Sequence, residues 1–372
     1  MNSKAEIFQH FTPNLLAWAA GQHRPMPWKG ERDPYRIWLS EVILQQTRVE
    51  QGWPYYLRFT EHYPTVRHLA DAPQDAVLKL WEGLGYYSRA RNLHATARHV
   101  ANDLAGQFPD SYVGLLALKG VGEYTAAAIA SFAYDLPHAV LDGNVYRVLA
   151  RCFGIETPTD APAAKREFTA LANALLDPAQ PAAFNQAMMD FGATICTPVQ
   201  PHCPACPLRT DCVAYRLDKV AELPRKSKAK PRKDRLFTYA VFCHQDDTYV
   251  RQRVAQDIWQ NLYEFPLLEL TAWPDDFNEL PPLLLRPWFP EGTPAGLEVT
   301  AISKPFRQTL THRQVTAVFI EIQLAAATSP AIFANPPFAG WLRLSRADLK
   351  KNIAVPRIID WYLQDIALTL RL

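Results

Sequence analysis

The stretch ICTPVQPHCPACPLRTDC, residues 195–212, holds four of the six cysteines of this 372-residue chain in the pattern C-x6-C-x2-C-x5-C. Prolines at 198, 201, 204 and 207 keep the intervening backbone out of a helix, so the loop can bend round one centre. Four thiolates suit a tetrahedral zinc ion or a 4Fe–4S cluster. There is one close cysteine pair rather than the two typical of structural zinc, so the spacing slightly favours iron–sulfur and leaves the metal open. The predicted ligands are Cys196, Cys203, Cys206 and Cys212.

Composition predicts a soluble globular chain with room for two domains, because 48% of the residues are hydrophobic and 20% are charged. The N-terminal MNSKAEIFQHF has no apolar targeting segment, and no apolar run is long enough to span a bilayer. We therefore expect a cytoplasmic protein with no membrane partner. In that reducing compartment a cysteine cluster indicates a metal site rather than disulfides.

The first part of the chain has helical signals. Asp33 followed by Pro34 is typical of an N-cap and first helical residue, and RIWLSEVILQQTRV, residues 36–49, would continue that helix. Gly154 is a plausible C-cap. Asp160 is a candidate cap for a helix over 165–176. These signals predict an all-helical domain over residues 1–217.

The composition changes after residue 217. Residues 218–235 are basic and interrupted by prolines, and they predict a linker. Residues 236–243, 248–254 and 314–322 are rich in β-branched and aromatic side chains, which is typical of strands. Residues 356–370 return to helical spacing. We therefore expect an α+β domain over 236–372.

A second motif is LLALKGVGEYTAAAIASFA, residues 115–133, in which one helix would end near Lys119 and another begin at about Glu123. The glycines of the intervening GVG permit a sharp turn and leave helix N–H groups free to bind a phosphate. Any pair of helices can be joined by GxG, so this motif alone favours a purely structural interpretation. Further along, Asp142 stands directly before a helix, where it could be no more than a cap.

The order of a helix–GxG–helix, a single aspartate and a four-cysteine loop is more specific. Over its first two thirds the chain resembles the helix–hairpin–helix DNA glycosylases of the endonuclease III superfamily. This resemblance implies a 4Fe–4S cluster in the loop 196–212, near a basic DNA-facing surface. It also implies that the hairpin contacts DNA through Gly120, Val121 and Gly122.

Within this superfamily, strand-cutting members carry a lysine nucleophile at the position of Tyr124. A tyrosine cannot form a Schiff base, and the chain is similar instead to adenine DNA glycosylases of the MutY type. The resemblance implies that Glu41 protonates adenine N7 and that ionised Asp142 stabilises the sugar oxocarbenium ion. It further implies that Asn144 orients Asp142 and that Tyr124 assists Glu41.

The same resemblance assigns two further sets of residues, each of which could otherwise be ordinary packing or surface residues. The base must leave the duplex before its glycosidic bond can be reached. The implied adenine pocket consists of Arg24, Met26, Trp28 and Gln186. The implied wedge and DNA contacts beside the orphaned base are Gln46, Thr47, Leu84 and Tyr86.

The second domain is similar to the MutT-like (Nudix-fold) domain of the adenine glycosylases, through RQRVAQDIWQNLYEFPL, residues 251–267. It lacks the clustered glutamates of a Nudix hydrolase, so we expect no nucleotide hydrolysis. The family reads 8-oxoguanine with a Phe-Ser-His triplet, and Leu310, Thr311 and His312 stand at those positions. Without the family these three residues would be a strand edge.

Together these features predict a monomeric, monofunctional adenine glycosylase, associated with the bacterial nucleoid, whose partner is double-stranded DNA with adenine opposite 8-oxoguanine or guanine. Two alternatives remain at this stage. One is a bifunctional pyrimidine-lesion glycosylase with lyase activity, against which Tyr124 argues. The other is a non-catalytic lesion binder, against which the paired carboxylates Glu41 and Asp142 argue.

Overall fold

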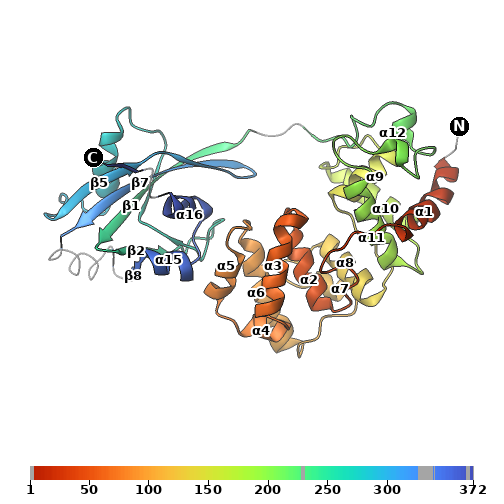
Figure 1. Ribbon diagram of the computed structural model, residues 1–372, viewed down its shortest axis with the longest axis horizontal. Helices are drawn as coiled ribbons and strands as arrows, with labels where there is room; N and C mark the ends of the chain where they lie inside the picture. The colour runs from red at the N-terminus through yellow and green to blue at the C-terminus, as the bar shows by residue number, and fades with distance from the viewer. Residues whose placement is uncertain (1–3, 228–230, 326–337, 339, 366–368, 372) are drawn as a thin grey trace. The chain divides into compact units, whose positions relative to one another are not determined.

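The protein is described by a computed structural model that covers residues 4–227, 231–325, 338, 340–365 and 369–371 (Figure 1). Its contacts divide the chain into two compact units, residues 1–71 with 92–229, and residues 72–91 with 230–372. We call these the helical unit and the sheet unit. The grouping of residues 72–91 with the second unit was not expected from the sequence. The boundaries 1–217, 218–235 and 236–372 stay a prediction.

The helical unit consists almost wholly of α-helices. α6 (Ser88–Asp103) begins in the segment that groups with the sheet unit and continues here. The other helices of this unit are α1 (Lys4–Ala20), α2 (Pro34–Leu44), α3 (Val49–His62), α4 (Val66–Asp71), α7 (Tyr112–Leu116), α8 (Glu123–Tyr134), α9 (Gly143–Phe153), α10 (Pro162–Leu175), α11 (Pro181–Thr194) and α12 (Val213–Arg216), with a 3-10 turn at Cys203–Ala205. None of the helices in the described part of the chain has the length and hydropathy needed to cross a bilayer.

Several helix ends follow the sequence signals. Asp33 accepts the N–H of Tyr35 at the start of α2. Gly154 ends α9 in the left-handed conformation, with φ 65°. Asp160 is not the cap that the sequence suggested, because it accepts hydrogen bonds from the N–H and hydroxyl of Ser227 while Ala161 takes the N-cap position of α10.

Two predicted helices are shorter than expected. α2 ends at Leu44 and not at residue 49, and the backbone then turns through Gln46, whose φ is 55°. Such a left-handed residue cannot continue a right-handed helix. α7 ends at Leu116 rather than near Lys119, and α8 begins at Glu123 as predicted.

The packing of α2 against α8 positions the site. α8 contains the buried run Ala126, Ala127 and Ala128, and small side chains let a neighbouring helix approach closely. α2 also buries large apolar side chains, including Trp38 and Ile43. A second part of the core lies around α9, α10 and α11 and includes Val148, Leu149, Phe168, Phe184 and Phe191.

The sheet unit is built on two long parallel strands, β1 (Lys233–His244) and β7 (Arg313–Leu324). The other strands are β2 (Asp247–Gln252), β3 (Tyr263–Glu264), β4 (Leu267–Leu270), β5 (Leu297–Ser303), β6 (Phe306–Thr309), β8 (Leu342–Ser345) and β9 (Thr369–Arg371). Their order is β3-β2-β1-β7-β5-β9, with β4 paired to β1, β6 to β7 and β8 to β2. The helices are α5 (Gln74–Trp81), α13 (Leu280–Leu285), α15 (Arg346–Asn352) and α16 (Arg357–Gln364), and a 3-10 turn lies at Phe277–Glu279.

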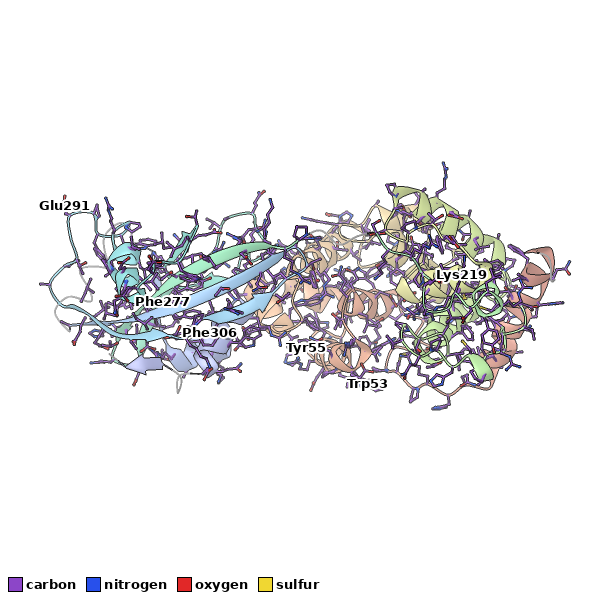
Figure 2. All side chains as sticks on the ribbon, turned by 90° about the horizontal axis from the view of Figure 1, so that it is seen from above. Trp53, Tyr55, Lys219, Phe277, Glu291 and Phe306 are labelled. Carbon is purple, nitrogen blue, oxygen red and sulfur yellow. The ribbon has the colours of Figure 1, made fainter. Side chains whose placement is uncertain are left out.

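Alternation along β7 places helices on both faces of the sheet. Ile320 and Ile322 share a core with Leu280 and Leu284 of α13. Phe319, which precedes Ile320 and therefore points to the opposite face, stacks on Tyr362 of α16, with ring centroids 4.1 Å apart. Phe306, labelled in Figure 2, packs edge-on against Phe319 on that side.

Two details of this part of the chain differ from what the sequence suggested. β1 begins at Lys233, inside the segment predicted to be a linker. The predicted helix over 356–370 ends at Gln364, and Thr369 begins β9; residues 366–368 between them lie outside the described residues. The three strands predicted from residues 236–243, 248–254 and 314–322 are confirmed as β1, β2 and β7.

Candidate active site

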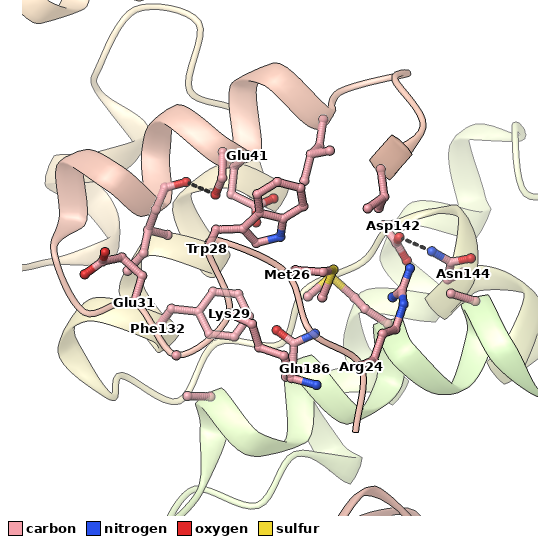
Figure 3. A pocket seen from close by; sticks show the side chains of 18 of the residues that line it. Arg24, Met26, Trp28, Lys29, Glu31, Glu41, Phe132, Asp142, Asn144 and Gln186 are labelled. Carbon is pink, nitrogen blue, oxygen red and sulfur yellow. Dashed lines mark hydrogen bonds between the residues drawn. The ribbon is translucent and has the colours of Figure 1, made fainter. Parts of the chain in front are cut away.

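Three helices bring their functional side chains to one cavity of about 610 Å³ in the helical unit (Figure 3). α2 provides Glu41, the first turn of α8 provides Tyr124, and the start of α9 provides Asp142. The two carboxylates therefore open onto the same space, as the predicted chemistry requires. We call this space the Glu41–Asp142 cavity.

Glu41 lies in an apolar environment. Eight of the 11 residues of α2 are buried, so the helix has almost no solvated face, and Glu41 is only 6% exposed. Its Oε2 atom has no hydrogen-bond partner among the residues that the structure describes. Burial raises the pKa of Glu41 to about 7, the charge of Asp142 adds to this, and the Tyr124 hydroxyl acts in the opposite direction. A large share of the Glu41 carboxyl groups therefore carries a proton at neutral pH.

Asp142, in contrast, is held by hydrogen-bond donors at both of its carboxylate oxygens. It is the N-cap of α9, where Oδ1 accepts the N–H of Val145 at 2.7 Å and Oδ2 accepts the side-chain N–H of Asn144 at 2.8 Å. Burial raises the pKa of Asp142 above its ordinary value, and these donors and the charge of Arg147 reduce that rise. The N-terminus of a helix also favours the anion. The cap role suggested by the sequence is real, and it leaves the carboxylate in the cavity wall.

Tyr124 lies beside both carboxylates. Its hydroxyl donates to the sulfur of Met189 at 3.5 Å, which is a weak acceptor. Burial and the charges of Glu41 and Asp142 raise the pKa of Tyr124 well above its ordinary value of 10. Tyr124 therefore remains a neutral donor at the bottom of the cavity.

Arg147 supports Asp142 through Asn144. The Arg147 guanidinium donates to Asn144 Oδ1 at 2.8 Å, to the carbonyl of Gly192 at 2.6 Å and to the carbonyl of Cys196 at 2.7 Å. A Cβ atom at Gly192 would lie 2.6 Å from the Cβ of Asn144, so only glycine permits this approach of α11 to α9. Sequence reasoning missed Arg147, although a buried arginine on an apolar helix face was a signal.

The implied adenine pocket is part of the same cavity. Arg24, Met26 and Trp28 enter it from the segment between α1 and α2, and Gln186 enters from α11 (Figure 3). Trp28 is packed edge-on against Tyr56, with ring centroids 5.4 Å apart. Apolar and aromatic side chains such as Met26 and Trp28 thus share the cavity wall with many polar and charged ones, and they offer apolar surface to a planar base.

Comparison with known proteins identifies the family. Residues 39–173 match the HhH-GPD superfamily of base excision DNA repair proteins. The adenine DNA glycosylase of Buchnera aphidicola subsp. Acyrthosiphon pisum is 33% identical over 69% of this chain and 73% of the relative. The mouse adenine DNA glycosylase is 43% identical over 55% of this chain and 42% of the relative.

The chain belongs to the adenine DNA glycosylase family. It is an adenine-specific DNA N-glycosylase, an enzyme of base excision repair. A thermostable thymine-DNA glycosylase superposes with a TM-score of 0.54 at 29% identity, over 58% of this chain and 100% of that chain. A trapped endonuclease III–DNA covalent intermediate gives 0.51 at 22% identity, over 59% and 99%, and shows the shared fold.

The hairpin of the glycosylase has the geometry that GVG predicted. Gly120 has φ 77°, and a Cβ there would lie 2.7 Å from the Cβ of Asn92, so the position needs glycine for two reasons. Among the described residues, nothing lies within 4 Å of the Cβ position of Gly122. The side chain of Val121 is buried, so the DNA contact predicted for this residue would have to come from its backbone.

The implied wedge residues fall into both units of the enzyme. In the helical unit, Gln46 adopts a positive φ and Thr47 lines the Glu41–Asp142 cavity. In the sheet unit, Leu84 is buried, whereas Tyr86 is 48% exposed. A buried leucine can act as a wedge only if its surroundings rearrange, and the exposed Tyr86 needs no such change.

Leu310, Thr311 and His312 form the turn between β6 and β7, rather than the strand edge that the sequence suggested. Thr311 and His312 are exposed and Leu310 is partly buried. The Thr311 hydroxyl is hydrogen-bonded to the hydroxyl of Tyr86 at 2.8 Å within the sheet unit. Two residues that the resemblance assigned to lesion contact are therefore neighbours.

The four cysteines of the loop 196–212 line one small cavity together with Arg151 and Cys152. Arg151 donates to the sulfur of Cys196 at 3.5 Å and to the carbonyl of Thr197 at 2.7 Å. Within the described ranges, no group of three or more His, Cys, Asp or Glu side chains has the geometry of a metal site. The donor set fits an iron–sulfur cluster, and binding remains a proposal.

Proposed function

We propose that this glycosylase removes adenine paired with 8-oxoguanine or guanine, by protonating the base from Glu41 and stabilising the sugar with Asp142. The observation that supports the proposal most directly is that the two carboxyl groups open onto one cavity in contrasting environments. Paired carboxyl groups in such different surroundings are typical of acid and base assignments in enzymes.

In the proposed reaction the adenine swings out of the duplex into the Glu41–Asp142 cavity. The Glu41 proton passes to adenine N7, the bond between N9 and C1′ breaks, and the electron pair of that bond leaves with the base. Ionised Asp142 stabilises the positive charge that develops on the sugar. Water then adds its oxygen to C1′, which leaves an abasic site, and its proton is available to restore Glu41.

The neighbours of these carboxylates have supporting roles in the proposal. Asn144 fixes the orientation of Asp142, and Tyr124 lies beside Glu41, where its hydroxyl lowers the pKa of that carboxyl group. Arg24, Met26, Trp28 and Gln186 would hold the base, since all four line the cavity. Gly120 and Gly122 would present their N–H groups to a DNA phosphate.

Four thiolates, from Cys196, Cys203, Cys206 and Cys212, would hold a 4Fe–4S cluster that cross-links the loop. We propose a structural role for it near the DNA-facing surface. The purified protein should show the visible absorbance of an iron–sulfur centre and contain iron and sulfide, and Cys203→Ser should lose both. Zinc in place of iron would contradict this assignment.

We further propose that the sheet unit is MutT-like and recognises the base opposite adenine through Thr311 and His312. Leu310 replaces the family's aromatic residue, so discrimination between 8-oxoguanine and guanine should be weaker than a phenylalanine would allow. We propose that the enzyme acts as a monomer in the cytoplasm.

The decisive experiment uses duplexes in which adenine stands opposite 8-oxoguanine, guanine or thymine, with alkali added after incubation. The proposal predicts alkali-labile strands at the adenine of the first two duplexes and none opposite thymine. Strand cutting without alkali, together with borohydride trapping of a protein–DNA adduct, would instead indicate lyase chemistry. Equal cleavage of all three duplexes would contradict the proposed mismatch preference.

A further inference from the structure

The segment between α1 and α2, residues 21–33, carries much of the proposed adenine pocket, yet it forms neither helix nor strand. Met26 and Trp28 both project from it into the Glu41–Asp142 cavity (Figure 3). A segment without regular hydrogen bonding needs other contacts to hold side chains in register for catalysis. We call it the pocket loop.

The pocket loop is tied to α11 by one buried carboxylate. Asp190 is 4% exposed and forms two ion pairs, from Oδ1 to Arg24 at 2.7 Å and from Oδ2 to Lys29 at 2.9 Å. The two cations lie on either side of Met26 and Trp28 in the sequence. Each carboxylate oxygen thus holds one end of the stretch that lines the cavity.

Asp190 also lies on the helix that faces the base. It follows Gln186 by one turn of α11, so both side chains lie on the same side of the helix. The preceding residue, Met189, accepts the hydroxyl of Tyr124. One turn of α11 therefore carries the proposed base reader, Gln186, and contacts both the pocket loop and the tyrosine beside Glu41.

We infer that Asp190 is a positioning residue, which holds Met26 and Trp28 in the adenine pocket through its ion pairs with Arg24 and Lys29. Without the carboxylate, two cations would face each other with no anion between them, and their repulsion would move the pocket loop away from α11. Asp190 lies outside the cavity lining and does not touch the base. Its effect therefore reaches the reaction only through the loop.

This inference rests on the proposed function, because it assumes that adenine occupies the cavity. It also makes a claim about the free protein that can be tested without DNA. Trypsin cleaves faster where the backbone can move into its active site, so the rate of cleavage after Lys29 and Arg32 reports how firmly the pocket loop is held. Faster cleavage at these bonds in Asp190→Asn than in the wild type would support the clamp whatever the substrate proves to be.

The test with DNA compares Asp190→Asn, which keeps the shape and removes the charge, with Asp190→Glu, which keeps the charge. We expect Asp190→Asn to lower the single-turnover rate of adenine release about 30-fold, with less than about a threefold change in DNA affinity, because misplacement of a binding group by an ångström costs up to about 100-fold. Asp190→Glu should recover most of the rate. The double variant Asp190→Asn/Lys29→Met should be no slower than Asp190→Asn, because one of the repelling cations is gone.

Glu156 provides a matched control. It also bridges two cations, Lys219 at 2.7 Å and Arg225 at 2.9 Å, but these exposed ion pairs lie outside the cavity lining. Glu156→Gln should leave both the tryptic pattern of the pocket loop and the rate unchanged.

A full rate and an unchanged tryptic pattern in Asp190→Asn would overturn the inference. Rate losses that multiply in the double variant would also overturn it, since Asp190 would then not act through Lys29. Absence of adenine release in the wild type, with faster tryptic cleavage in Asp190→Asn, would reject the proposed function and keep the clamp.

Discussion

The surroundings of Glu41 and of Asp142 differ although both carboxyl groups open onto one cavity. Glu41 sits in the middle of a helix that is buried on nearly all sides, and its Oε2 has no partner among the described residues. Asp142 sits at the N-terminus of a helix and accepts hydrogen bonds at both oxygens. The comparison shows how one fold can favour the protonated form of one carboxyl group and the ionised form of another.

The largest expected effect comes from removing either group. Glu41→Gln takes away the proton donor, and Asp142→Asn takes away the negative charge that faces the sugar. Each should lower the single-turnover rate of adenine release by about 10³-fold, while DNA binding survives. Full activity in either variant would show that the two environments are unrelated to catalysis. Gel-shift affinity for the same duplex provides the control.

The next largest expected effect is on the free energy of unfolding, which should respond differently to changes at Glu41 and at Asp142. The pKa of Glu41 is raised from 4.5 to about 7, so its contribution to stability is complete below the unfolded pKa and is lost as the pH rises through about 7. At about pH 8, Glu41→Gln should therefore raise the free energy of unfolding by about 3 kcal/mol, and at about pH 4 it should change little. Denaturant titrations at both pH values test this.

Asp142→Asn is the matched comparison for stability. Asparagine caps a helix as well as aspartate does, and the donors around Asp142 reduce the rise that burial causes in its pKa, so Asp142→Asn should raise the free energy of unfolding at about pH 8 by less than Glu41→Gln does. A stabilisation at about pH 8 equal to that of Glu41→Gln would mean that the two surroundings do not differ as described.

Asn144→Ala tests how much the hydrogen bond from Asn144 to Asp142 contributes to the rate. This change removes the 2.8 Å hydrogen bond to Asp142 Oδ2 and leaves the main-chain cap from Val145 intact. Loss of one positioned donor should slow adenine release by about 10-fold to 100-fold. Single-turnover kinetics measure this, and Asn144→Asp, which cannot donate when ionised, should behave similarly. An unchanged rate would assign the orientation of Asp142 to the cap alone.

The smallest effect is expected from Tyr124→Phe. The Tyr124 hydroxyl lowers the pKa of Glu41, so its removal should raise that pKa further. The alkaline limb of the pH–rate profile should then shift to higher pH by less than about one unit. In the wild type the rate should fall above about pH 7, where Glu41 loses its proton. A shift of the alkaline limb to lower pH would contradict the inference that Tyr124 lowers the pKa of Glu41. Rates of both proteins across the same buffer series provide the comparison.

Some of these features could be read from particular residues of the sequence. Asp33 and Pro34 indicated the start of α2, Gly154 indicated the end of α9, and the order of GVG, Asp142 and the cysteines indicated the family. These signals are local, since a cap or a tight turn depends on a few neighbouring residues. The end of α2 at Leu44 and the start of β1 at Lys233 could not be predicted from the sequence, because tertiary contacts decide where a helix or strand stops.

The supporting residues of the site could not be predicted. Arg147 contacts Asn144 from one turn away but also the carbonyls of Gly192 and Cys196, which are about 45 and 49 positions distant in the chain. Asp190 contacts Arg24 across 166 positions. No spacing rule connects such residues, so only the packed helices show that they meet.

The sequence by itself determined the chemistry that this protein has available, namely a carboxylate in the middle of an apolar helix, an aspartate that caps another, and four thiols in a proline-rich loop. Residue types and local backbone preferences are enough for that. Only the tertiary structure decided that Oε2 of Glu41 is buried with no hydrogen-bond partner among the described residues, that Asp142 keeps its donors, and that both carboxyl groups open onto one cavity. Burial and distance depend on how helices pack, and they set which of two identical functional groups holds a proton at neutral pH.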